Sequence, residues 1–199
     1  MEFKELLMAR YATKKFDGKK IDEDKFDQVM DMIRFSPSAL NIQPWKIKVV
    51  TDEETKKKLS AASMDQAQIT TCSHLLIFCA LTDLPGNAEK ITTMMKGVGV
   101  PEENLKMFQE VIDIFLSNYT SETRVVEAQH NVFIAATTAI YAAKSLGIDS
   151  CPMQGFNPED YSEILDIPSG LVPTILVPMG YPADKQMPKM RFPKEDIFF

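Results

Sequence analysis

Basic side chains stand in pairs near both ends of this chain of 199 residues. Arg10 and Lys14 are four residues apart, so on a helix or its frayed end they face the same side. Lys189 and Arg191 are two residues apart, so in an extended segment they also share a side. If the two segments meet in the folded chain, the four cations would bind a phosphate group well. The alternative is that each is an ordinary solvated surface charge.

A loop of small polar residues, stiffened by proline, spans Ser36 to Trp45 with the sequence S-P-S-A-L-N-I-Q-P-W. Its Asn41 and Gln43 carry amide groups that can bond to backbone groups or to hydroxyls of a ligand. Turn chemistry alone would explain about half of the residues in this loop. Together with the basic pairs, the loop would suit an anionic, flat, redox-active cofactor.

The composition narrows the class of protein. A hydrophobic content of 45% with 25% charged residues is ordinary for one globular domain, which we expect to span residues 1–199. The net charge of −6 argues against a nucleic-acid-binding surface. The charged N-terminal residues do not resemble a signal peptide, and no apolar run is long enough to span a membrane. We therefore expect a cytoplasmic protein with no membrane partner.

Cysteine and histidine usage points away from metal and hydrolase chemistry. The three cysteines lie in apolar stretches and are expected to be reduced packing residues. His74 and His130 are far apart and lack paired spacing, so we expect no metal site. The chain has no G-x-S-x-G for a serine hydrolase, and neither G-x-G-x-x-G nor G-x-x-x-x-G-K-[ST] for a dedicated nucleotide site.

Helices and strands are expected to alternate along the chain. Ile21 and Phe26 form a hydrophobic staple around Asp22, which predicts a helix that ends before Ser36-Pro37. The continuous apolar run from His74 to Leu81 predicts a buried strand. The other expected elements are strands over 45–50 and 171–177, and helices over 54–62, from 101 onward, over 122–146 and from 157 onward.

Two segments indicate a partner subunit. The middle of the longest expected helix, Val132 to Ala143, is apolar on nearly every side, as in helices central to a domain, to a subunit contact, or to both. Eight of the twelve prolines fall at or after Pro152, and this tail also carries Met190 and Phe192, which favour burial. We expect this segment to wrap around a second subunit; the alternative is that it packs along its own domain.

Three motifs carry a resemblance to a known family. R-Y-A-T-K-K-F at Arg10 to Phe16, the Ser36–Trp45 loop, and P-K-M-R-F-P at Pro188 to Pro193 resemble the nitroreductase family of FMN-dependent oxidoreductases. The resemblance spans nearly the whole chain and is weakest from Leu84 to Thr123. It implies an α+β fold with a central, mostly antiparallel sheet flanked by helices. It also implies a homodimer with FMN at the interface and a C-terminal arm that extends to the partner subunit.

The resemblance implies which residues of the two basic segments bind FMN. Arg10, Lys189 and Arg191 would bind its phosphate group. Lys14 would lie at the pyrimidine edge of the flavin, where a fixed positive charge favours the reduced, anionic form. Two further residues, Tyr11 and Ala12, would contact the cofactor mainly through their backbone. Relatives often have Ser or Thr in place of Ala12, so one side-chain hydrogen bond is expected to be missing.

Two other segments would approach the flavin ring. The Ser36–Trp45 loop would cross the dimer interface and cover the flavin of the other subunit, with contacts from Pro37, Ser38, Ala39 and Asn41. The run C-P-M-Q-G-F from Cys151 is similar to the family's P-x-[EQ]-G-F and implies contacts from Met153, Gln154 and Gly155. A backbone N–H near the glycine would point at flavin N5, the atom that accepts hydride, and glycine permits this close approach.

The remaining site residues are Asp65, Gln68, Phe108 and Phe115. Asp65 and Gln68 would lie at the pyrimidine edge, and Gln68 takes a position where the best-known relatives have lysine, so that second cation is missing. Phe108 and Phe115 would cover the open face at which substrates bind. The alternative for these two aromatic residues is a stripe of the hydrophobic core.

The implied reaction is the ping-pong, two-electron reduction of nitroaromatics, quinones or similar small acceptors with NAD(P)H as electron donor. No residue is expected as a dedicated acid or base, because the flavin carries the chemistry. The alternatives are a specialised flavin, enone or pteridine reductase, and a non-catalytic FMN-binding redox sensor.

Overall fold

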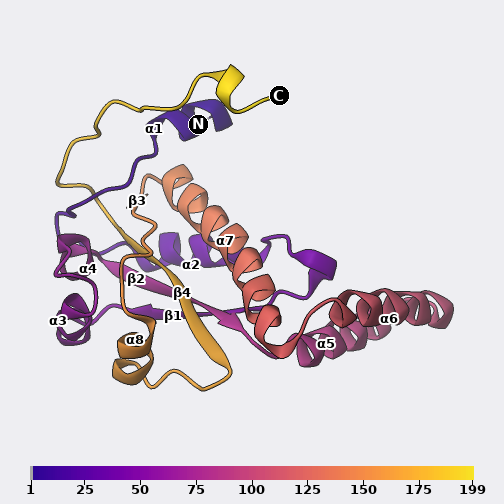
Figure 1. Ribbon diagram of the computed structural model, residues 1–199. Helices are drawn as coiled ribbons and strands as arrows, with labels where there is room; N and C mark the ends of the chain where they lie inside the picture. Colours follow the sequence, from indigo (N-terminus) through magenta and orange to yellow (C-terminus); the bar gives the residue numbers. More distant parts are fainter. Residues whose placement is uncertain (1) are drawn as a thin grey trace.

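A four-stranded antiparallel sheet forms the centre of the protein, whose computed structural model describes residues 2–199 (Figure 1). Its strands are β1 (Trp45–Val50), β2 (His74–Leu81), β3 (Asp149–Ser150) and β4 (Leu171–Gly180). The strands lie in the order β1-β2-β4-β3, and each neighbouring pair is antiparallel. With helices on its two faces, this sheet confirms the predicted α+β class.

Within residues 2–199 the structure has eight α-helices. They are α1 (Phe3–Ala9), α2 (Glu23–Arg34), α3 (Glu53–Ala61), α4 (Ala67–Thr71), α5 (Leu84–Gly97), α6 (Glu102–Ser117), α7 (Ser121–Ser145) and α8 (Pro158–Ile164). Two short 3₁₀ turns cover Ala39–Asn41 and Lys194–Asp196. None of the helices in this described part of the chain is long and apolar enough to cross a membrane.

The middle of β2 is buried on both faces of the sheet, because alternate side chains of a strand point in opposite directions. The core on the side of α2 and α7 contains Leu76, Phe78 and Ala80. The core on the side of α3, α4 and α8 contains Leu75, Ile77 and Cys79. Burial on both faces accounts for the continuous apolar run from which this strand was predicted.

The long helix α7 packs against both central strands, β2 and β4. The Thr120 hydroxyl caps its start by accepting a hydrogen bond from the Thr123 N–H, and Gly147 follows its end with φ +76°. Ala135 and Ala139 have no exposed surface, so the helix is central to the domain, as predicted. Ile134, however, keeps 42% of its surface exposed, so this chain alone does not cover the helix on all sides.

Several predicted boundaries need correction. The strand expected to end at Val177 continues to Gly180, because its last residues pair with β3. The helices α1, α4 and α5 were not predicted. Asp22 does precede α2, but its side chain makes no capping hydrogen bond. Asp52, by contrast, caps α3 as expected, since its carboxylate accepts a hydrogen bond of 2.8 Å from the Thr55 N–H.

The helical placement of the first basic pair is also wrong. Helix α1 ends at Ala9, and Arg10 has extended backbone angles (φ −74°, ψ 133°). The chain stays extended as Ala12 forms a parallel bridge with Ser150. Because side chains of an extended segment alternate, residues four apart still lie on one side. Arg10 and Lys14 can therefore face the same cavity without a helix.

The two ends of the chain lie side by side. The Asp17 N–H donates to the Tyr181 carbonyl at 2.9 Å, and the Ala183 N–H donates to the Lys15 carbonyl at 2.8 Å. Residues 182–199, here called the arm, then run back along the N-terminal segment toward α1 (Figure 1). The structure thus satisfies the condition that the two basic segments must meet.

The arm has no regular structure apart from the 3₁₀ turn Lys194–Asp196, as its prolines predicted. Its apolar side chains are not buried by their own chain: Met190 is 86% exposed and Phe192 is 79% exposed. The arm therefore follows its own domain without covering its apolar residues. Its contact with a partner subunit remains a prediction.

The fold contains one histidine whose titration should affect stability. The His74 ring stacks on Phe26, and burial, with additional repulsion from Lys20 and Lys56, lowers the pKa of His74 from 6.5 to about 4. Below pH 6.5 the unfolded chain binds a proton at this residue, whereas the folded protein does not until pH 4. This contribution to stability is therefore complete above pH 6.5 and decreases as the pH falls to 4.

We expect the free energy of unfolding of the parent to fall more steeply between pH 6.5 and 4 than that of a His74→Gln variant. The difference should reach about 2 kcal/mol, after allowance for solvent screening at the partly exposed ring. Urea titrations at four or five pH values measure it. His130→Gln controls for the loss of an exposed histidine. Parallel pH dependences of the parent and His74→Gln would contradict this account of His74.

Candidate functional site

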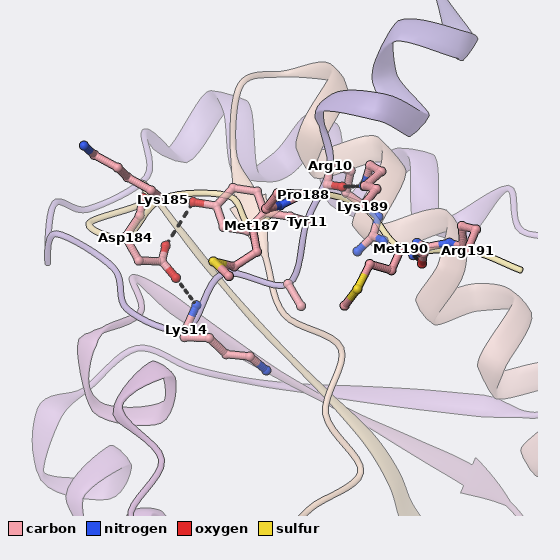
Figure 2. A pocket seen from close by; sticks show the side chains of 11 residues that line it. Arg10, Tyr11, Lys14, Asp184, Lys185, Met187, Pro188, Lys189, Met190 and Arg191 are labelled. Atoms are coloured by element: carbon pink, nitrogen blue, oxygen red, sulfur yellow. Dashed lines mark hydrogen bonds between the residues drawn. The ribbon is translucent and has the colours of Figure 1, made fainter.

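A cavity of about 380 Å³ lies where the N-terminal segment meets the arm (Figure 2). It brings together six of the residues predicted from the sequence: Arg10, Tyr11, Ala12, Lys14, Lys189 and Arg191. The cavity is also lined by Asp184, Lys185, Met187, Pro188 and Met190, which were not predicted. Residues almost 180 positions apart, such as Arg10 and Lys189, are thus neighbours.

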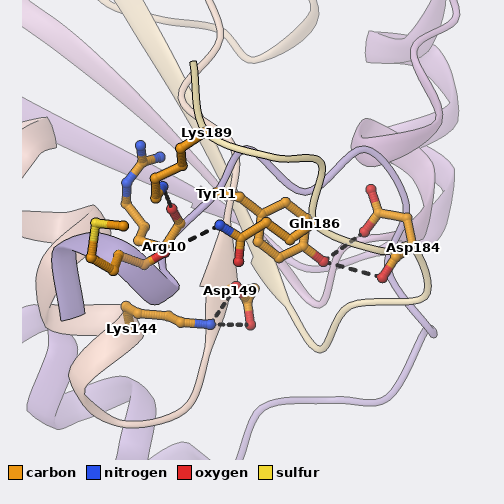
Figure 3. A network of polar contacts seen from close by, with 8 residues as sticks. Arg10, Tyr11, Lys144, Asp149, Asp184, Gln186 and Lys189 are labelled. Atoms are coloured by element: carbon orange, nitrogen blue, oxygen red, sulfur yellow. Dashed lines mark hydrogen bonds and ion pairs between the residues drawn. The ribbon is translucent and has the colours of Figure 1, made fainter. Parts of the chain in front are cut away.

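Asp184 holds the two sides of the cavity together (Figures 2 and 3). One carboxylate oxygen accepts a hydrogen bond of 2.9 Å from the Tyr11 hydroxyl, and the other accepts one of 2.7 Å from the Lys14 N–H. Burial, together with the neighbouring Asp184 carboxylate, raises the pKa of Tyr11 to about 12. The hydroxyl therefore stays protonated as a donor, and the link between the segments persists over the physiological pH range.

The positively charged side chains of the cavity have few hydrogen-bond acceptors within the described chain. Within residues 2–199 the buried Arg10 Nε has no hydrogen-bond partner. The Lys189 ammonium donates to the Arg10 carbonyl, and the Arg191 guanidinium to the carbonyl of Met190. Burial lowers the pKa of Lys189, and the positive charges of Arg10 and Arg191 lower it further. Such mutual repulsion is relieved by an anion placed between the cations.

A buried ion pair lies next to this cavity (Figure 3). The Lys144 ammonium, near the end of α7, donates to both carboxylate oxygens of Asp149 at 2.8 and 3.0 Å. This pairing neutralises Lys144 locally and ties the end of α7 to β3. Lys144 is therefore a structural cation, in contrast to the unpaired Arg10 Nε.

Lys14 connects the cavity with the segment from Cys151 to Phe156. Its ammonium lies 3.7 Å from the buried Cys151 thiol. Burial raises the pKa of Cys151, so this thiol stays protonated despite the nearby positive charge. The Lys14 side chain thus reaches from the basic cavity to the start of the segment whose glycine the resemblance places near flavin N5.

That turn is held by a glutamine that the site prediction did not include. Gln66 donates from Nε2 to the Gly155 carbonyl at 3.0 Å, and the Gln68 amide donates to Gln66 Oε1 at 3.1 Å. Gln68 is only 3% exposed, whereas Asp65 is exposed and accepts a hydrogen bond from the Ser60 hydroxyl. Neither Asp65 nor Gln68 lines the basic cavity; their predicted contact with the flavin edge stays a prediction.

The Ser36–Trp45 loop lies outside the basic cavity. Of its predicted contact residues Pro37, Ser38, Ala39 and Asn41, none lines the basic cavity of the described chain. The Ala39 N–H donates to Asn131 Oδ1 at 2.8 Å, which fixes the loop against the middle of α7. Within the loop the Gln43 N–H donates to the Ser38 hydroxyl at 2.9 Å. These hydrogen bonds hold the loop on α7, away from the cavity of its own chain, and its contact with the flavin of a second subunit stays a prediction.

Phe108 and Phe115 lie on α6 and are half-buried against the main core. Phe115 also contacts the ring of Tyr119, with ring centroids 5.1 Å apart. Neither residue lines the basic cavity. Their position fits the core alternative in this chain, and their role at a substrate site stays a prediction.

The residues that sequence reasoning missed have weak local signals. Asp184 lies in a proline-rich stretch for which the sequence predicts an irregular tail. The one local signal is the excess of nearby cations, which favours a carboxylate among them. Gln66 lies two residues before Gln68 in a polar turn, and nothing local indicates that it meets Gly155. Both contacts depend on segments that are far apart in the sequence.

The fold and the cavity together define an α+β protein with a cluster of cations between its N-terminal segment and its arm. Comparison with known proteins identifies the family to which it belongs. The profile of the nitroreductase family matches residues 7–181. A protein of Staphylococcus haemolyticus that carries the name NAD(P)H nitroreductase is 31% identical over 200 residues, which cover 94% of this chain and 92% of the relative.

Two solved structures share the fold. A protein from Staphylococcus epidermidis described as an NAD(P)H:FMN oxidoreductase is 26% identical with a TM-score of 0.90, covering 98% of this chain and 94% of that one. A nitroreductase-like protein from Exiguobacterium sibiricum, solved in complex with FMN, is 22% identical with a TM-score of 0.89, covering 99% and 96%. This chain belongs to the nitroreductase family. The family and the enzyme class predicted from the sequence, an oxidoreductase, are thereby confirmed.

Proposed function

We propose that this protein is an FMN-dependent NAD(P)H oxidoreductase that reduces small acceptors by a ping-pong, two-electron reaction. The observation that carries the proposal is the basic cavity, in which the buried Arg10 Nε lacks a partner within residues 2–199. A relative of the same fold is solved with FMN, and relatives carry the name NAD(P)H nitroreductase. A cofactor with a phosphate tail supplies the anion that the cavity lacks.

The residues present fit FMN. Arg10, Lys189 and Arg191 would bind its phosphate group with charge-assisted hydrogen bonds. Lys14 extends from this cavity toward Cys151 and so lies between the phosphate site and the Gly155 turn, where the ring would lie. Tyr11 and Ala12 line the same cavity and are tied to Asp184 and Ser150, which keeps their backbone in place.

When bound, FMN supplies the redox chemistry, taking a hydride from NAD(P)H and passing two electrons to the acceptor. The chain's own contribution is to bind and orient. The Gly155 turn would present its backbone to the ring, and the Lys14 charge would favour the more negative reduced form. Solvent can supply protons, so the reaction needs no dedicated acid or base from the protein.

We propose that the enzyme is a homodimer, because the loop that the resemblance places over a flavin lies away from the cavity of its own chain. The Ser36–Trp45 loop is fixed on α7 and lies outside the basic cavity. An apolar depression of about 480 Å³ opens between α1, α2 and α7, and Phe3 and Phe35 at its edge are 64% and 75% exposed. This depression and the apolar side chains of the arm both favour burial against a second copy. In the dimer, the loop of one subunit would cover the flavin of the other.

Nitroaromatics, quinones and similar flat, electron-poor molecules are the proposed acceptors, since they can stack on the open face of a flavin. A yellow purified protein supports FMN binding, and bleaching of its colour by NADH or NADPH in a stopped-flow instrument supports a reductase. A yellow protein that neither nucleotide bleaches would instead be an FMN-binding sensor.

The phosphate site predicts the effect of removing one guanidinium. Arg191→Ala should weaken FMN binding by about one to two decades, because a charge-assisted hydrogen bond contributes roughly 1.5 to 3 kcal/mol. Quenching of FMN fluorescence on binding measures the dissociation constant. Lys194→Ala, which removes an exposed cation farther along the arm, is the control. An Arg191→Ala protein that binds FMN as tightly as the parent would show that this residue lies outside the phosphate site.

Lys14 predicts a redox effect separate from binding. Lys14→Met should lower the midpoint potential of the bound flavin and slow its reduction by NAD(P)H, while the phosphate contacts still hold the cofactor. For a two-electron couple, about 30 mV corresponds to roughly 1.4 kcal/mol, so even a partly screened charge gives a measurable shift. Potentiometry of the two proteins measures the shift, with Lys15→Met as the control. An unchanged potential would mean that another group tunes the flavin.

The dimer proposal predicts a molar mass of twice 22.4 kDa by light scattering. Deletion of the residues after Pro182 should expose apolar surface, remove Lys189 and Arg191, and cause loss of FMN together with aggregation. Light scattering and the flavin absorbance of the truncated protein measure both effects. A stable, flavin-loaded monomer of either length would rule out the dimeric site.

A further inference from the structure

Backbone hydrogen bonds hold the turn at Gly155 at both of its ends, and one side chain holds its middle. On the N-terminal side, Met153 exchanges backbone hydrogen bonds of 2.9 Å with Leu176 in β4. On the C-terminal side, the Asn157 N–H donates to the Ala62 carbonyl at 2.8 Å. Between these anchors, within residues 2–199, Gln66 is the one side chain from another segment that bonds to the turn.

The N–H groups of this turn are available to a ligand. Neither Gln154 nor Gly155 donates a backbone hydrogen bond to any group within residues 2–199. The Phe156 N–H is used within the turn, where it donates to the Gln154 carbonyl at 3.0 Å. A Cβ on Gly155 would lie 3.3 Å from Gln66 Nε2, so glycine allows the amide to approach its carbonyl closely. The turn therefore has two backbone donors without a partner within residues 2–199, while the Gly155 carbonyl accepts a hydrogen bond from Gln66.

Gln66 is itself held in one orientation. Its Nε2 also donates to the Ser63 carbonyl at 3.1 Å, and its Oε1 accepts from the buried Gln68 amide at 3.1 Å. Flipping the amide would place an oxygen against two carbonyl oxygens and a nitrogen against a nitrogen donor. Met64 and Asp65, with φ of +55° and +50°, form the left-handed turn that presents Gln66. Local hydrogen bonds hold this turn, since the Met64 N–H donates to the Ala61 carbonyl at 3.3 Å and the Asp65 N–H donates to the Ser60 carbonyl at 2.9 Å.

We propose that Gln66 is a positioning residue for the hydride step. By holding the Gly155 carbonyl, it fixes the turn so that a backbone N–H of the turn meets the flavin at N5. Gln66 does not itself touch the reacting atoms. This inference rests on the proposed function, since it assigns Gln66 a role toward the same flavin.

Gln66→Glu is the sharpest test, because glutamate has the same shape but its carboxylate cannot donate to the Gly155 and Ser63 carbonyls. Gln66→Met, which is neutral and also lacks the donor, is the second variant if glutamate impairs folding. Gln28→Glu is the matched control, since Gln28 donates its amide to the Asp24 carbonyl on the exposed face of α2.

Three measurements separate positioning from general damage. In the cofactor-free protein, hydrogen exchange of the Phe156 amide should become faster in the Gln66 variants. In proteins loaded with ¹⁵N-labelled FMN, the N5 resonance should move toward that of flavin without a hydrogen bond at N5. The dissociation constant of FMN should change by less than about threefold, whereas flavin reduction by NAD(P)H should slow about tenfold, as expected for a misplaced reaction geometry. The Gln28→Glu protein should match the parent in all three.

The possible failures are distinguishable. If the parent binds FMN and both Gln66 variants keep the parent's N5 resonance and reduction rate, Gln66 has no positioning role and the proposed function stands. Equal losses of FMN affinity and reduction rate would also overturn the positioning role, because they indicate a general defect of the site. If the parent does not bind FMN, the proposed function fails, and the role of Gln66 toward a flavin fails with it.

Discussion

The contact between the two ends of the chain is the constraint on which the site depends. Backbone hydrogen bonds join Asp17 to Tyr181 and Ala183 to Lys15, and the Asp184 carboxylate joins Tyr11 to the Lys14 N–H. A Cβ on Gly180 would lie 2.9 Å from the Phe16 ring, so the two segments pack closely at this point. Without this pairing the two basic segments would be separate surface charges. With it, they form one cavity.

The cluster of cations lowers the stability of the ligand-free protein and favours the binding of an anion. Burial lowers the pKa of Lys189, and the positive charges of Arg10 and Arg191 lower it further, so bringing these cations together costs electrostatic free energy. Among residues 2–199, Asp184 is the one carboxylate that lines the cavity, and its oxygens accept hydrogen bonds from the Tyr11 hydroxyl and the Lys14 N–H. An anionic ligand therefore relieves repulsion that the fold itself maintains. Binding the ligand should stabilise the folded protein by mass action as well.

Much of the fold was predictable because its signals are local. The strand over 45–50 and the buried strand over 74–81 follow from apolar runs, and the Asp52 cap follows from the preference of helix starts for a short acidic side chain. The basic pairs were found from their spacing, but a separation of four fits either a helix or an extended segment. The extended conformation of Arg10 was therefore not decidable locally. Asp184 and Gln66 escaped prediction because their roles come from long-range contacts that have no local pattern.

The cavity is built from segments that are far apart in the sequence, and this determines when during synthesis the cofactor can bind. Arg10 and Lys14 leave the ribosome long before Lys189 and Arg191, which come more than 170 positions later in the chain. The strand β4, which completes the centre of the sheet, likewise comes late in the chain. A phosphate-bearing cofactor therefore has no complete cavity to enter while the first 180 residues are being translated. It cannot guide early folding, so the segments made before Lys189 must fold through their own contacts before the ligand adds any stability.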